Sequence, residues 1–494
     1  MRRHLGFLLK DTAVYGLASG ASRFVKVLLV PIVARQFTPE IFGVFDSAGV
    51  YVYVLAVLGV LGVDSAVILS ARRAVPPDAT PEMIREGRRR AMSTAFTISL
   101  VASLAVAAVL GAAPALWSRA LLDSDWYAGA ILWAAATVPC SAVLVYTLSL
   151  LKWEFRRSWF LVASLGSAFA SVAFTYYSAF HTSAGLTGLM AASFAGQLLG
   201  AAIGCWACRD LIGLRFDRDL ARRTLAVGLP FAVVGVASGI APSLDRLFLN
   251  HAHTLADAGI YGVGQKIATL QALVLSGFQA AWGPFAFSME HAPGKGALFG
   301  RVFLLITVIG SYFTLGLVTL APWLARVAAG PEYVGATAYV LPLGLSIVLA
   351  TIFFVVSIGA FLEGRTAFNL YAYVTGVGVT LALNVVLVAL ETPPVAIAWA
   401  NCFGQAASVT FMAWLAQRVH PVPYPFLRGA VTLAAAAGVG LLIARWAPEA
   451  GIGSVTGTLA ALTAAAGLWG WFGVLSPAER RALRLRLGHR TGGS

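Results

Sequence analysis

Four basic residues lie inside long apolar stretches of this sequence, where a membrane-spanning helix tolerates charge least. Arg23 and Lys26 occupy the stretch SRFVKVLLV, one helical turn apart. Arg246 and Lys266 occupy two later stretches. A charge at the centre of a bilayer costs at least about 2.5–3.5 kcal/mol, so a residue of this kind usually serves a function. Because Arg and Lys donate charge-assisted hydrogen bonds to phosphate oxygens, the four side chains are candidates for binding an anionic substrate.

Three acidic residues in similar stretches are candidates for charge partners or for a coupling-ion site: Asp46, Asp64 and Asp245. Four cations against three anions leave a modest positive surplus. Asp64 lies toward the end of its stretch and is expected to reach none of the others. Asp245 is expected to act as a partner within its own half of the chain. A coupling-ion role stays open for Asp46 and Asp64.

Depth in the membrane separates the four cations. Lys26 and Lys266 lie about 13 and 12 Å below the outer ends of their predicted helices, at comparable depth in the two halves of the chain. Arg23 lies deeper, at about 18 Å, and Arg246 shallower, at about 6 Å. The alternative for Arg23 and Lys26 is a simple pairing with Asp46 or an extension to the membrane surface. Extension suits Arg246 but not Arg23, which is too deep.

The composition shows what kind of element must hold these charges. Of the 494 residues, 59% are hydrophobic and only 11% are charged, whereas soluble domains carry roughly 25% charged residues. The chain is therefore expected to be an integral membrane protein. The four cysteines all fall in apolar stretches, and the two in a CxxC have no nearby His or further Cys, so neither a disulfide framework nor a metal site is predicted. No nucleotide-binding loop is found, and no cofactor or catalytic residue is predicted.

Apolar stretches long enough to cross a bilayer occur about fourteen times. The predicted spans are 12–33, 42–70, 91–113, 128–150, 158–180, 185–208, 226–250, 258–283, 298–321, 336–361, 367–390, 395–417, 429–446 and 455–475. Most of the 35 Lys and Arg residues fall in the tails and in every second loop. The opposite loops hold only Arg35, Arg119, Arg326 and Arg445.

This asymmetry places both termini in the cytoplasm. It also accounts for the net charge of +14, because the excess would lie along the inner membrane face, where anionic lipid attracts it. Nucleic-acid binding is not needed to explain the basic character of the chain.

A short repeat links the two halves. FTPEIFGVF at residues 37–45 and HTLADAGIYG at 253–262 each place a Thr five residues before a Gly, a β-branched residue and an aromatic residue. Both segments lie at the first outer turn of a predicted six-helix block. The sequence therefore predicts two parallel repeats, related by an axis along the membrane normal.

The segments around this repeat resemble a known family. DTAVYGLASGASRFVKVLLVPIVARQFTPEIFGVF near the N-terminus, and GLPFAVVGVASGIAPSLDRLFLNH followed by DAGIYGVGQKIATL, look like the lobe signatures of polysaccharide biosynthesis flippases. These are the Wzx-type O-antigen flippases of the multidrug/oligosaccharidyl-lipid/polysaccharide exporter superfamily. The extra helix pair is similar to that of fourteen-span members, which include lipid II flippases.

The resemblance implies two six-helix bundles that meet in a V around a cavity lined by spans one, two, seven and eight. It implies that the chain is a transporter and not an enzyme, located in the bacterial inner membrane. The implied substrate is an undecaprenyl-pyrophosphate-linked oligosaccharide, moved from the inner to the outer leaflet by alternating access for O-antigen, exopolysaccharide or capsule assembly. The resemblance also allows contacts with other polysaccharide assembly proteins.

The predicted fold is thus an all-α polytopic membrane protein with about fourteen transmembrane helices. Two six-helix lobes are related by a pseudo-twofold axis, and a C-terminal helix pair follows. The expected boundaries are 1–208 for the N-terminal lobe, 209–420 for the C-terminal lobe, 421–475 for helices 13 and 14, and 476–494 for a basic cytoplasmic tail.

Three alternative functions remain. A lipid II flippase of peptidoglycan synthesis would share the fold and a cationic cavity. A drug/cation antiporter of the same superfamily would require an acidic cavity, whereas these spans lean positive. A membrane glycosyltransferase or polymerase belongs to another class, and the short outer loops without acidic clusters count against it.

Overall fold

The computed structural model describes residues 20–22, 24–25, 27–67, 80–289, 294–365 and 367–446, and this part of the chain contains helices and no strands. The helices are α2 (Leu29–Val33), α3 (Pro39–Val60), α5 (Pro81–Ala112), α6 (Pro114–Leu122), η1 (Asp125–Tyr127), α7 (Ala128–Trp153), α8 (Arg157–His181), α9 (Gly185–Ala207), α10 (Arg218–Ala252), α11 (Leu255–Ser288), α12 (Lys295–Ala328), η2 (Pro331–Ala336), α13 (Thr337–Leu362), α14 (Ala367–Ala389), α15 (Val395–Val419) and α16 (Phe426–Trp446).

Ten of the described helical segments are long and apolar enough to cross a membrane. They coincide with predicted spans two to six and nine to thirteen, and α10 and α11 coincide with spans seven and eight. The prediction of an all-α polytopic membrane protein is confirmed. Predicted span fourteen, the tail 476–494 and residues 12–19, 23 and 26 of span one lie outside the described residues.

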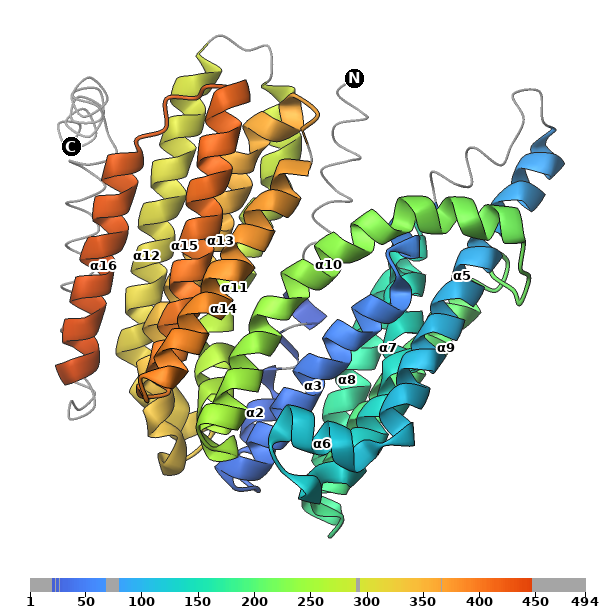
Figure 1. The fold of residues 1–494 in the computed structure, drawn as a ribbon, viewed down its shortest axis with the longest axis horizontal. Helices are drawn as coiled ribbons and strands as arrows, with labels where there is room; N and C mark the ends of the chain where they lie inside the picture. Colours follow the sequence, from blue (N-terminus) through green and yellow to red (C-terminus); the bar gives the residue numbers. More distant parts are fainter. Residues whose placement is uncertain are drawn as a thin grey trace, which may run out of the picture.

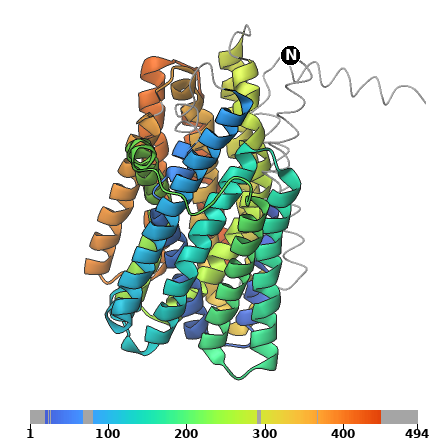
Figure 2. The ribbon, with the colours of Figure 1, turned by 90° about the vertical axis from the view of Figure 1, so that its right-hand side faces the viewer.

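The helices form two groups that lie together at one end of the molecule and diverge toward the other (Figure 1). Helices α5 to α9 make up one group and α11 to α16 the other, with α3 and α10 running between them (Figure 1). The view from the side shows the α5 to α9 group in front (Figure 2). We call the end where the groups meet, which carries the turns before α3 and α11, the closed end.

Both turns at the closed end are built from the repeated Thr. The side chain of Thr38 accepts a hydrogen bond from the backbone of Ile41 at the start of α3. Thr254 forms a capping box with Asp257 at the start of α11, where each side chain accepts from the other residue's backbone N–H at 3.1 Å. Such caps satisfy N–H groups that a helix start leaves unpaired. The repeat in the sequence therefore marks two equivalent helix starts.

The repeated glycines lie where α3 and α11 cross. A Cβ added to Gly43 would lie 1.9 Å from the carbonyl oxygen of Leu255, and one added to Gly259 would lie 2.0 Å from that of Pro39. The two contacts are reciprocal: each glycine faces the first residue of the other helix. This exchange is what a pseudo-twofold axis through the crossing produces. The close approach of the two backbones requires glycine at both positions.

Gly43→Ala is expected to lower the melting temperature of the purified protein, because the new methyl group forces two backbones apart at the closed end. Overpacking of this kind typically costs about 1–3 kcal/mol. Gly49→Ala on the same helix is the control, since nothing lies within 4 Å of its added Cβ. That variant should melt at or slightly above the wild-type temperature. Equal melting of the two variants would mean that the crossing is not tight.

Helix α10 contacts both groups. A Cβ on its Gly228 would lie 2.9 Å from the carbonyl oxygen of Leu61, beyond the end of α3. At that point the apolar segment of α3 breaks, with Leu61 and Gly62 both in the left-handed region at φ 53° and 66°. Helix α10 also packs against α14 and α15. The lobe boundary at residues 208 and 209 stays a prediction, because the first helix after it belongs by its contacts to both lobes.

Candidate ion-network site

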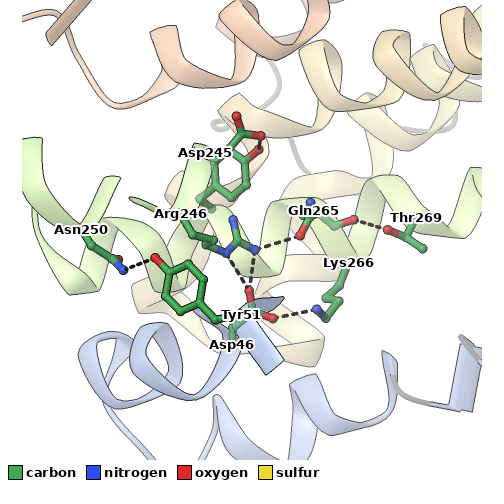
Figure 3. A network of polar contacts seen from close by, with 9 residues as sticks. Asp46, Tyr51, Asp245, Arg246, Asn250, Gln265, Lys266 and Thr269 are labelled. Carbon is green, nitrogen blue, oxygen red and sulfur yellow. Dashed lines mark hydrogen bonds and ion pairs between the residues drawn. The ribbon is translucent and has the colours of Figure 1, made fainter. Parts of the chain in front are cut away.

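One carboxylate of α3 holds two cations that come from α10 and α11 (Figure 3). The Oδ2 of Asp46 accepts hydrogen bonds from Nε and Nη2 of Arg246, the former at 3.1 Å. Its Oδ1 accepts from Nζ of Lys266 at 2.7 Å. Gly262 leaves room for this carboxylate, since a Cβ there would lie 2.9 Å from Oδ2. We call Asp46, Arg246 and Lys266 the ion network.

Burial differs sharply between the two cations. The side chain of Arg246 is 0% exposed and that of Asp46 is 6% exposed, whereas that of Lys266 is 26% exposed. Arg246 is further held by Gln265, whose Oε1 accepts from Nη2 at 2.8 Å, and by the ring of Tyr261, 4.5 Å from its guanidinium carbon. A buried charge depends on such partners; they engage Nε and Nη2, whereas the buried Nη1 has no protein partner among the described residues. Arg246 is therefore built into the protein, while Lys266 can reach a ligand.

A second contact across the helices lies beside the ion network. The side-chain amide of Asn250 on α10 donates to the Tyr51 hydroxyl at 3.1 Å and to the carbonyl of Leu121 at 2.8 Å. The hydroxyl of Tyr51 donates to the same carbonyl at 3.1 Å. These bonds join α3, α6 and α10 near the closed end.

Asn250→Ala is expected to lower the melting temperature, because the Leu121 carbonyl and the Tyr51 hydroxyl each lose a hydrogen-bond donor. The loss should be about 1–3 kcal/mol of unfolding free energy. Tyr51→Phe is the matched comparison and should cost less, since Asn250 still reaches the Leu121 carbonyl. A larger loss for Tyr51→Phe than for Asn250→Ala would contradict this order.

Asp245 lies next to Arg246 in the chain but has different partners. Its Oδ2 accepts from the hydroxyl of Tyr261 at 2.6 Å and from the side-chain amide of Asn401 at 2.8 Å. Its Oδ1 is buried and has no protein partner. These partners come from α11 and α15, so the contacts of Asp245 stay within the predicted C-terminal lobe.

The remaining predicted site residues lie elsewhere. Asp64 follows the break after α3 and accepts a hydrogen bond from Ser149 at 3.0 Å. Arg23 and Lys26 lie outside the described residues, so their pairing with Asp46 stays a hypothesis. The described network carries one negative and two positive charges, and Asp245 brings the local sum to zero. Any net positive charge at the site therefore depends on Arg23 and Lys26.

The sequence prediction named only charged groups, so it omitted several residues of the site. They are Tyr51, Asn250, Tyr261, Gln265 and Asn401. Polar uncharged residues inside apolar stretches are the signal that would have found them, since a buried amide or hydroxyl needs a partner. Among the described residues, no group of three or more His, Cys, Asp or Glu could hold a metal ion.

A family model described as polysaccharide biosynthesis protein matches residues 32–282, a little more than half of the chain. The chain belongs to the polysaccharide biosynthesis protein family. The matched segment runs from α2 through most of α11 and so contains the whole ion network. A comparison with curated proteins finds no significant match.

Solved transporters share the fold at low sequence identity. Lipid II flippase MurJ in an inward closed conformation aligns with a TM-score of 0.69 and 13% identity over 91% of this chain and 98% of that chain. A multidrug resistance MATE family transporter of the MOP superfamily aligns in its inward-facing conformation with a TM-score of 0.61 and 15% identity, over 86% of this chain and 96% of that chain. The outward-facing conformation of a multidrug resistance MATE family transporter aligns with a TM-score of 0.50 and 14% identity, over 87% of this chain and 98% of that chain.

At these identities the likeness shows the fold alone. Within that limit, the inward-facing MATE structure aligns with a higher TM-score than the outward-facing one. This agrees with a molecule whose two helix groups meet at the closed end and diverge at the other. The chain is a multi-pass membrane protein with the architecture of a membrane transporter.

Proposed function

We propose that this protein is a flippase for undecaprenyl-pyrophosphate-linked oligosaccharides, which it moves from the inner to the outer leaflet of the bacterial inner membrane. The observation that carries the proposal is the ion network, in which one carboxylate of the first lobe holds two cations of the second. The membership in a polysaccharide biosynthesis family supports the class of cargo. Both termini are cytoplasmic in this proposal, so the closed end faces the outer leaflet.

The charges suggest how cargo and lobe movement are coupled. A pyrophosphate that approaches from the open side meets Lys266 before Arg246, because of these two cations Lys266 is the partly exposed one. Phosphate oxygens then compete with Asp46 for the ammonium group. As the ion pair between Lys266 and Asp46 weakens, α3 and α11 lose one of the interactions that join them. Binding energy for the anion is thereby converted into opening of the closed end, as alternating access requires.

The other parts of the proposal follow from the same picture. The protein is not an enzyme and needs no cofactor, because moving a lipid between leaflets makes and breaks no covalent bond. The two lobes are 1–208 and 209–420, followed by the helix pair 421–475 and the tail 476–494. Exposed Arg85, Arg222 and Arg223 near the open end would contact anionic lipid of the cytoplasmic leaflet. Contacts with other polysaccharide assembly proteins remain an expected partnership.

The surroundings of Asp46 and Asp64 make both carboxylates less suitable as a coupling-ion site. Asp46 has both oxygens engaged by cations, and Asp64 is hydrogen-bonded beyond the break in α3. Asp245 keeps one buried oxygen without a protein partner, so it is the carboxylate best placed to change its proton or ion occupancy during transport. A drug/cation antiporter, which would require an acidic cavity, is disfavoured because the carboxylate of Asp46 is already paired with Arg246 and Lys266.

A lipid II flippase is the second candidate, favoured by the MurJ alignment. The two cargoes share a lipid pyrophosphate and differ in the sugar. Reconstitution of the purified chain into vesicles tests both. The transbilayer movement of undecaprenyl-pyrophosphate-linked oligosaccharide and of lipid II should be measured side by side, with and without proton and sodium gradients. We expect faster movement of the oligosaccharide lipid. Movement of neither lipid under any gradient would refute the proposal, and preference for lipid II would favour the second candidate.

A further inference from the structure

An apolar pocket of about 570 Å³ lies between helices α3, α5, α6 and α10. Its lining includes Leu55 and Leu58 of α3, Val109 of α5, Trp117 of α6 and Leu247 of α10. The volume falls within the range of about 300–1,000 Å³ that is common for sites binding small molecules. Nothing in the ion network or the helix crossing requires a hollow at this place.

The polar groups of the lining are all used by the protein itself. The indole N–H of Trp117 donates to the carbonyl of Val109 at 3.0 Å. The hydroxyl of Tyr51 is bonded to Asn250 and to the Leu121 carbonyl, and Ser243 also has a partner. A polar ligand would lose its water and gain no hydrogen bond from these side chains. The pocket therefore suits a hydrocarbon.

The mouth of the pocket lies within the membrane-spanning part of the molecule. Leu58 is 40% exposed and Val109 is 58% exposed, and both belong to segments that can cross a membrane. A hydrocarbon chain can therefore enter sideways from the bilayer without crossing a polar layer.

The pocket lies directly beside the ion network. Leu247 follows Arg246 on α10, and Tyr51 is five residues beyond Asp46 on α3, about 7.5 Å along the helix axis. In Figure 3, Tyr51 and Asn250 lie on one side of Arg246, and Lys266 lies on its other side. A hydrocarbon pocket next to a network whose Lys266 is a partly exposed cation complements an amphiphile that has an anionic head and an apolar tail.

We propose that this pocket holds the polyisoprenyl chain of the lipid-linked cargo near the closed end, an inference that rests on the proposed function. Three lining residues, Ser243, Leu244 and Leu247, come from α10, and the others come from helices of the first lobe. The shape of the pocket therefore changes when the lobes move. The tail of a transported lipid must be bound and released as the lobes move. A resident bilayer lipid does not require a pocket whose shape depends on that movement.

Photo-crosslinking tests the proposal in the full-length protein in lipid nanodiscs. Benzoylphenylalanine is placed at Val109 in the pocket or, as a control, at Val101, which is 60% exposed on the same helix but does not line the pocket. Radiolabelled undecaprenyl phosphate is the probe. We expect labelling at Val109 to exceed that at Val101 at least about tenfold, because only the pocket buries the chain. Unlabelled undecaprenyl phosphate should compete, and added phosphatidylglycerol should not.

Filling the pocket provides the second measurement. Ala105→Trp inserts a large ring among the lining residues, and Ala108→Trp makes the same change at an exposed position of α5 outside the lining. Only Ala105→Trp should reduce labelling at Val109, while both variants should elute as monodisperse protein. Equal labelling at Val109 and Val101, or crosslinks at Val109 to bulk phospholipid alone, would overturn the tail site.

These outcomes separate the tail site from the proposed function. If vesicles still show movement of lipid-linked oligosaccharide but Val109 captures no isoprenoid, the tail site is wrong and the function stands. If Val109 captures the isoprenoid specifically and no lipid-linked sugar moves, the function is wrong while the binding site stands.

Discussion

Asp46→Asn is expected to abolish transport and to loosen the closed end, because it leaves two cations without their shared carboxylate. Arg246 is fully buried, and among the described residues Asp46 is the acidic side chain to which it donates hydrogen bonds. Removing one partner of a buried ion pair typically costs about 3–5 kcal/mol. The substitution keeps the shape of the side chain, so the effect reports on charge. Transport is measured as lipid movement in vesicles.

Loosening of the closed end can be measured separately. Phe42 is 2% exposed near the start of α3, so a Phe42→Cys side chain should react slowly with a maleimide once the four native cysteines are replaced by serine. Adding Asp46→Asn should raise that reaction rate at least about tenfold, the factor that corresponds to 1.4 kcal/mol. An unchanged labelling rate together with normal transport would show that the ion network does not hold the lobes together.

Arg246→Gln and Lys266→Gln are expected to fail in different ways. Arg246 is buried under Tyr261 and bonded to Gln265, so its loss should destabilise the protein by about 3–5 kcal/mol and stop transport with it. Lys266 is 26% exposed and makes one ion pair. Its loss should therefore reduce transport and weaken anion binding while changing the melting temperature much less.

The measurements are thermal unfolding, transport and binding of undecaprenyl pyrophosphate by each purified variant. Arg119→Gln is the control for loss of an arginine charge, because Arg119 pairs with Asp125 at an exposed position, with 69% and 49% of the side chains accessible. Exposed pairs contribute only about 0–1 kcal/mol, so this variant should melt and transport normally. Lys266→Gln protein that binds the lipid pyrophosphate as well as wild type would remove Lys266 from the substrate site.

The double variant Asp46→Asn, Lys266→Gln adds a further check. Removing a carboxylate and one of its cations together leaves fewer unpaired charges than removing the carboxylate alone. The two changes should therefore be non-additive by about 0.5–3 kcal/mol in unfolding free energy. Strict additivity would mean that the two side chains do not interact in solution as they do in the structure.

The sequence by itself determined the class of the molecule and most of its helices. An apolar stretch of about 20 residues can satisfy its backbone in a bilayer only as a helix, so composition and length are enough to place spans. Thr38 and Gly43 recur as Thr254 and Gly259 with the same spacing, and this repeat indicated two equivalent units. Local bonds are enough to produce it, since each Thr caps the helix that follows it. Asp46, Arg246 and Lys266 could also be singled out, because a charge inside a membrane segment is costly wherever it points.

Only the tertiary structure decided which of these charges belong together. Asp46 lies close in sequence to Arg23 and Lys26, but its described partners are Arg246 and Lys266, about two hundred positions away. Hydropathy carries no information on which face of a helix a residue occupies when nearly every face is apolar. The reciprocal approach of Gly43 and Gly259 sets the crossing of α3 and α11, which brings Asp46 to Lys266, and the packing of α10 against α3 adds Arg246. Pairing across the lobes is a property of helix packing, which no single segment encodes.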